Sequence, residues 1–142
     1  MNRMSPSEWR AFLLESPRTA KAATVRPDGR AHVAPVWFDL DGQDLLFTTW
    51  HTTVKARDLQ RDPRISLCVD DERPPFSFVL IDGEASLSDD VAEVRAWATR
   101  IAARYMGSMR AKSFGERNGV AGELLVRVRP TRVVAQRGIT ET

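Results

Sequence analysis

The sequence has little cysteine, little histidine and no long apolar run. Its 142 residues include one cysteine and two histidines. A lone Cys68 excludes an internal disulfide and a thiolate metal site. His32 and His51 fall on separate predicted elements and lack the usual ligand spacing, so we expect no metal. The chain also lacks a glycine-rich phosphate loop of the Walker or dinucleotide-binding type, which excludes enzymes that bind nucleotides through such loops. It has no G-x-S-x-G motif, which excludes an α/β-hydrolase.

The charge is nearly balanced, with 21 basic and 19 acidic residues and a formal net charge of +2. Because the charges are interspersed and form no basic face, we expect no nucleic-acid partner. No apolar stretch is long enough to cross a membrane, and Met1–Arg10 has no apolar leader region. We therefore expect a cytoplasmic protein with no membrane partner, folded as a single domain over residues 1–142.

The pattern of apolar residues and turn residues predicts mostly hairpin-connected strands. We expect helices near 6–15, 52–61 and 88–106, the last capped by Ser88, and an irregular or briefly helical segment over 108–121. We expect strands at 21–26, 32–40, 45–49, 65–69, 76–87, 124–128 and 133–136. Gly83 is placed to mark a β-bulge. The fold class is therefore mainly β (α+β): a six- to seven-stranded antiparallel barrel with peripheral helices, which excludes a doubly wound parallel sheet.

The segment from the third strand into the following helix is the strongest candidate for a binding site. Thr48 and Thr49 end the strand, Thr53 precedes the helix, and Lys55 and Arg57 lie in its first turn. Helix N-termini bind anions through free N–H groups and the positive end of the helix dipole. These residues favour a phosphate or carboxylate site. The alternative is a capped surface helix with two ordinary cations.

A second candidate is the strand His32–Phe38, which proline interrupts. Pro35 cannot donate a ladder hydrogen bond, so this strand is expected at a sheet edge or to be irregular. Free backbone groups there can meet a planar ligand. The alternative is an edge strand that proline protects from aggregation.

Several segments together carry a family resemblance, namely Arg30–Phe38, Asp41–Gly42, Leu45–Thr49, Thr53–Leu59 and Arg61–Leu67. Over about residues 18–137 the chain resembles the split β-barrel flavin-binding superfamily, the pyridoxamine 5′-phosphate oxidase-like proteins of the FMN-binding split barrel type. Within it, the chain is most similar to the small oxidoreductases that use coenzyme F420. Its preference for arginine over lysine is typical of GC-rich genomes and fits the microbes that make F420.

The resemblance implies a cofactor site. Lys55 matches the lysine that binds the cofactor phosphate, Arg57 the cation two positions on, and Thr53 a residue that also faces the phosphate. Thr48 and Thr49 match contacts to the ring system. The strand on the other side of the ring is matched by Val33, Ala34, Pro35, Val36 and Trp37.

The resemblance also implies a reaction and an assembly. The expected function is hydride transfer between reduced F420 and an unsaturated small organic substrate. The alternatives are an FMN-dependent oxidase or reductase of the same fold and a non-enzymatic F420- or haem-binding protein, in which His32 or His51 would be the axial ligand. We expect a homodimer with the cofactor at its interface and the last strand, near Gln136, facing the partner's cofactor.

Some features depart from the family or match no motif in it. The additional basic positions that pyridoxamine phosphate oxidase uses near its C-terminus have no match, so vitamin B6 oxidation is not expected. His51 and Tyr105 are able to donate protons, although solvent serves equally. Lys112 and Arg117, in the unmatched segment 108–121, are candidates to meet the polyglutamate tail of F420.

Overall fold

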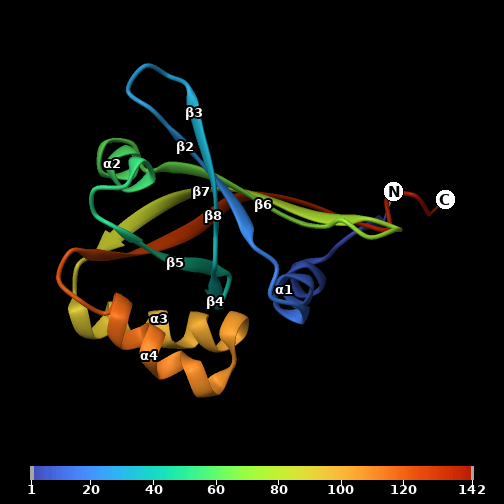
Figure 1. The fold of residues 1–142 in the computed structure, drawn as a ribbon. Helices are drawn as coiled ribbons and strands as arrows, with labels where there is room; N and C mark the ends of the chain where they lie inside the picture. The colour runs from blue at the N-terminus through green and yellow to red at the C-terminus, as the bar shows by residue number, and fades with distance from the viewer. Residues whose placement is uncertain (1, 142) are drawn as a thin grey trace.

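The strands of the chain form one antiparallel sheet with helices around it, which confirms the predicted fold class. The computed structural model describes residues 2–141, and Figure 1 shows their arrangement. The described strands are β1 (Asn2–Arg3), β2 (Ala20–Val25), β3 (Ala31–Val36), β4 (Asp39–Asp41), β5 (Asp44–Trp50), β6 (Arg64–Asp71), β7 (Ser77–Ser88) and β8 (Glu123–Arg137). The described helices are α1 (Pro6–Glu15), α2 (Val54–Arg61), α3 (Val91–Met106) and α4 (Ser108–Asn118). No helix within 2–141 has the length and apolar character needed to cross a bilayer.

The sheet is curled so that its two edges meet. The strand order is β3-β2-β6-β7-β8-β5-β4, with β1 paired to β8. β3 and β4 lie at opposite ends of this order, yet only Trp37 and Phe38 separate them in the chain. Two residues span only about 7 Å, so the ends of the sheet must come together as a barrel. The strand predicted over 32–40 is therefore two strands, and the prediction that Pro35 lies on an edge strand is confirmed.

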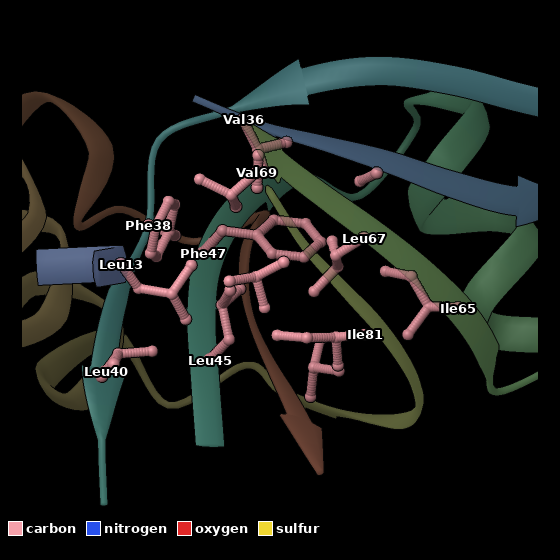
Figure 2. Packing of buried hydrophobic residues seen from close by; sticks show 14 of the residues in the cluster. Leu13, Val36, Phe38, Leu40, Leu45, Phe47, Ile65, Leu67, Val69 and Ile81 are labelled. Atoms are coloured by element: carbon pink, nitrogen blue, oxygen red, sulfur yellow. The ribbon is translucent and has the colours of Figure 1, made fainter. Parts of the chain in front are cut away.

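The barrel interior is packed by side chains that alternate along the strands. On β6, Ile65, Leu67 and Val69 are buried, as the alternation predicts, while Ser66 is exposed. Figure 2 shows these side chains meeting Phe47 from β5 inside the barrel. Fully burying a side chain of this size stabilises the fold by about 1.5–3 kcal/mol.

The C-terminal strand is longer than expected. Two strands on either side of Pro130 were predicted, but β8 runs without a break. Its register with β7 shifts where Asp82 pairs with Arg132 and Gly83 pairs with Pro130, which leaves Thr131 as the extra residue. The bulge lets a residue without an N–H stay in the strand. The predicted irregularity at Gly83 is confirmed, and a Cβ there would lie 2.7 Å from the Arg129 carbonyl oxygen.

Two expectations about the helices were wrong. The segment expected to be irregular or briefly helical forms the eleven-residue helix α4. The cap of α3 is Asp90, whose side chain accepts from two backbone N–H groups, while Ser88 accepts from the Asp90 N–H. α4 packs tightly against α3 at two glycines, since a Cβ on Gly115 would lie 1.9 Å from Thr99 Oγ1 and one on Gly119 2.4 Å from Arg95 Cβ.

The contact at Gly115 gives a testable consequence. Gly115→Ala should lower the free energy of unfolding by about 1–3 kcal/mol, because the new methyl group overlaps Thr99. In a Thr99→Ala background the same substitution should cost less than about 1 kcal/mol, because alanine is the better helix former. Urea unfolding of the four proteins measures both values, with Ser113→Ala on the exposed side of α4 as control. An equal effect in both backgrounds would contradict the proposed contact.

Candidate functional site

The start of α2 is held by a threonine cap at Thr53, one residue after the predicted helix start at Thr52. The Thr53 hydroxyl accepts from the Ala56 N–H at 3.2 Å and donates to the Trp50 carbonyl at 3.0 Å. It also lies 2.7 Å from the Thr49 hydroxyl, which donates to it, because the single proton of Thr53 is already committed. Both lone pairs and the proton of Thr53 are thus used within the protein. In this arrangement the Thr53 hydroxyl holds the helix start.

The sequence predicts that Lys55 and Arg57 act together on one anion, but the structure does not bring their side chains together. Residues two apart on a helix point about 200° apart around its axis. Lys55 is half-buried and faces a hollow beside the sheet, whereas Arg57 is exposed and does not line it. One lysine, rather than a lysine and an arginine, therefore faces the hollow from α2.

The hollow has a volume of about 320 Å³ and gathers residues from six elements and one loop. This lies at the lower end of the ~300–1,000 Å³ typical of ligand sites. Its walls are Pro35, Val36, Trp37, Thr48, Lys55, Ala98, Ile101, Ala102, Asn118 and Glu123. Half of these residues were predicted site residues. Of the other predicted residues, Val33 is exposed, Thr49 is buried, and neither they nor Ala34, Thr53 and Arg57 line the hollow.

The remaining lining residues were not predicted as a site. Ala98, Ile101 and Ala102 belong to the apolar stripe of α3, whose helical spacing is equally typical of ordinary core packing. Asn118 and Glu123 carry no local signal, because α4 and β8 place them beside α2 only after folding. A larger hollow of about 530 Å³ lies at Thr24, Arg64 and Thr131 and contains none of the predicted residues.

Lys55 and Glu123 form the electrostatic centre of the smaller hollow. Burial lowers the pKa of the Lys55 ammonium, and the field of Glu123 partly offsets this. Burial raises the pKa of the Glu123 carboxyl, and Lys55 acts in the opposite direction. Among residues 2–141, neither side chain forms an ion pair within 4.0 Å. Lys55 is therefore a half-buried cation without a close counter-ion.

The aromatic wall is fixed by α3 and α4. Trp37 stacks on Tyr105 with ring centroids 5.0 Å apart and an interplanar angle of 3°, and Phe114 lies against it at 6.0 Å. The Tyr105 hydroxyl accepts from the Phe38 N–H at 3.2 Å and donates to the Arg18 carbonyl at 2.7 Å. Burial raises the pKa of this phenol. Tyr105 thus positions the wall and has no proton directed into the hollow.

The other candidate groups lie outside the hollow. His51 Nδ1 is 3.0 Å from the Gly122 carbonyl oxygen and donates to it. Lys112 and Arg117 are exposed, and Lys112 lies 4.0 Å from Glu116. Gln136 lines a separate hollow near the C-terminal end of β8. Within the described part of the chain, no group of three or more His, Cys, Asp or Glu residues is arranged for a metal ion.

The cap at Thr53 leads to a prediction. Thr53→Ala should lower the free energy of unfolding by about 0.5–2 kcal/mol, whereas Thr53→Ser, which keeps the hydroxyl, should be close to the parent. Urea unfolding measures both variants, and Thr52→Ala, one position outside the cap, is the matched control. A parent-like stability of Thr53→Ala would show that the hydroxyl does not carry the helix start.

Comparison with known proteins finds the same fold in several of them. A conserved hypothetical protein of Mycobacterium tuberculosis superposes with a TM-score of 0.85 at 24% identity, covering 96% of this chain and 87% of that one. A protein described as an F420 reductase superposes with a TM-score of 0.71 at 28% identity, over 87% and 94% of the two chains. The haem storage protein HutZ of Vibrio cholerae gives 0.73 at 18% identity, over 97% and 100%.

No curated protein matches the chain. The family model described as pyridoxamine 5′-phosphate oxidase matches residues 5–137, which is nearly the whole sequence. The split barrel that the sequence resemblance implies is therefore confirmed, and the chain belongs to the pyridoxamine 5′-phosphate oxidase family.

Proposed function

We propose that this protein is an oxidoreductase that uses coenzyme F420 to transfer a hydride to or from an unsaturated small organic substrate. The observation that carries the proposal is Lys55, a half-buried ammonium without an ion-pair partner, at the mouth of a hollow walled by Pro35, Val36 and Trp37. The family includes oxidoreductases, and the likeness to an F420 reductase supports the choice of cofactor.

The residues present fit a cofactor with a planar ring system and an anionic tail. Lys55 supplies a positive charge, and the first-turn amides of α2 at Val54 and Lys55 have no acceptor within the helix. An anion at this position gains charge-assisted hydrogen bonds and the favourable end of the helix dipole. The apolar side chains of Val36 and Ile101 offer a water-poor surface to a ring.

The protein's part in the reaction is to position the cofactor and exclude water. A deazaflavin supplies the hydride chemistry when it is bound. Lys55 anchors the anionic tail, and the Trp37 side of the hollow orients the ring. The stack of Trp37 on Tyr105 keeps that wall rigid, so the ring position does not depend on a mobile loop. In the described chain the hydroxyl of Tyr105 and Nδ1 of His51 are engaged by backbone groups, which favours solvent as the source of any proton.

A titration tests this function. Purified protein should bind F420 and bind FMN more weakly. Lys55→Ala should weaken F420 binding by about 10-fold or more, since a lost hydrogen bond to a charged group costs about 1.5–3 kcal/mol. Cofactor fluorescence gives the dissociation constants. Arg30→Ala, which removes an equal charge from an exposed position, should bind as the parent does.

FMN binding, haem addition and turnover assays distinguish the alternative functions. Tight FMN binding and a yellow purified protein would establish the FMN-dependent oxidase or reductase. A Soret band after haem addition, lost in His32→Ala or His51→Ala, would establish the haem-binding protein. F420 binding without turnover on any electron acceptor would establish a carrier. Parent-like F420 affinity in Lys55→Ala would remove the proposed site.

We further propose that two copies of the chain form a homodimer that completes this site. The end of β6, the start of β7 and the end of β8 extend away from α2 toward the termini (Figure 1). On their outer face Leu80, which is 40% exposed, pairs in register with Cys68 on one side and Val134 on the other. Phe76 and Ile139, also exposed, border the same face. An exposed apolar patch of this kind is typical of an interface, and Gln136, which pairs with Phe78, lies on the same face of the sheet.

A charge on this face should prevent the dimer. Wild-type protein is expected at twice the 16.0 kDa chain mass, and Leu80→Glu at the single-chain mass, because the carboxylate would be buried without a partner. Sedimentation equilibrium measures both. Ser113→Glu, an exposed position on α4, should remain dimeric. A Leu80→Glu protein that stays dimeric would place the interface elsewhere.

A further inference from the structure

Glu123 is the second charged residue of the hollow that contains Lys55. The other eight lining residues are uncharged. β8 begins at Glu123, whose Cα pairs with that of Trp50 at the end of β5, so the barrel register fixes its position. Lys55 enters from α2. Because the two groups share the hollow without reaching ion-pair distance, a ligand that binds Lys55 also lies close to Glu123.

Neighbouring charges on the adjoining elements are directed elsewhere. His51 Nδ1 donates to the Gly122 carbonyl, and Arg95 donates to the Gly119 carbonyl at 3.0 Å. Arg57, the other cation of the α2 first turn, is exposed and outside the hollow. The electrostatic balance in the hollow is therefore set by one ammonium and one carboxylate.

This balance treats singly and doubly charged ligands differently. With both groups ionised the hollow carries no net charge, because Glu123 cancels much of the positive field that Lys55 provides. The field that remains offsets little of the cost of removing an anion from water. That cost rises with the square of the anion's charge, so a dianion is disfavoured more strongly than a monoanion. Like-charge opposition is a common way to reject a wrong ligand.

We propose that Glu123 makes this hollow selective for a singly charged phosphodiester over a doubly charged phosphomonoester. The inference rests on the proposed function: F420 carries its phosphate as a diester and FMN carries it as a monoester. Lys55 then binds the phosphate, and Glu123 disfavours a phosphate that carries a second negative charge. The selectivity between two cofactors with similar rings comes from one side chain that does not hold the ring.

The test compares FMN with its methyl phosphodiester, two ligands that share a ring and differ by one phosphate charge. At pH 7.5 the wild-type protein should bind the methyl ester about 10-fold more tightly, because desolvating the second charge of FMN is not offset where Glu123 cancels the field of Lys55. At pH 5.5 the difference should narrow, because the second phosphate pKa is about 6 and FMN becomes a monoanion. Flavin fluorescence titration gives both affinities.

Glu123→Gln should reduce the difference at pH 7.5 to about 3-fold or less, because both ligands bind more tightly without the opposing charge and the doubly charged FMN gains more. Glu116→Gln, which removes an exposed carboxylate, should keep the wild-type difference. Should Glu123→Gln not fold, Glu123→Ala repeats the comparison. Equal binding of the two ligands by wild type at pH 7.5, or an unchanged difference in the Glu123 variants, would overturn the inference while leaving the proposed function in place.

Failure of the proposed function has a different signature. If wild type binds neither flavins nor F420, the charge selectivity is measured with methyl phosphate and dimethyl phosphate, by their effect on the amide NMR signals of Val54 and Lys55. A response to methyl phosphate that strengthens more in Glu123→Gln than the response to dimethyl phosphate does would support the inference for an anion site of another kind. Equal responses in both proteins would overturn it.

Discussion

The barrel depends on the two-residue link between β3 and β4. This link carries the chain from one edge of the sheet to the other, and its backbone is held on both sides. The Tyr105 hydroxyl accepts from the Phe38 N–H and donates to the Arg18 carbonyl, and Arg104 donates to the Phe38 carbonyl. Buried backbone groups need such partners, so α3 is required for the sheet to close. Tyr105 also stacks on Trp37, so the residue that holds the link closing the barrel also orients one wall of the hollow.

The position of the hollow follows from that closure. It lies where the end of β3, the end of β5, the start of α2 and the start of β8 come together beside α3. Such a place offers unpaired helix amides, a half-buried lysine and apolar side chains in one small volume. A ring with an anionic tail needs these features, which supports the proposed site. The barrel interior is filled by core side chains such as Phe47, so the proposed binding surface lies outside that core.

The charged pair gives the hollow its chemical character. A lysine alone would attract any anion, and more strongly the more charge the anion carries. In the proposed site the carboxylate cancels much of this attraction, so the cost of desolvating a second charge would make recognition depend on the type of phosphate as well as its presence. In this view Lys55 provides affinity and Glu123 provides discrimination. The tight α3–α4 contact at Gly115 supports both, because it holds Asn118 and the apolar wall in place.

Local patterns in the sequence determined the elements of this protein. The period-two burial of Ile65 and Leu67, the cap at Thr53 and the irregularity at Gly83 each follow from chemistry within a few residues. The family resemblance and the place of Lys55 in the first turn of a helix predicted that its side chain contacts the cofactor phosphate. The tertiary structure alone placed Glu123 opposite Lys55, because these residues come from different elements and meet only when the sheet curls. Local propensity carries no information about such pairs, since their geometry is set by strand register and closure.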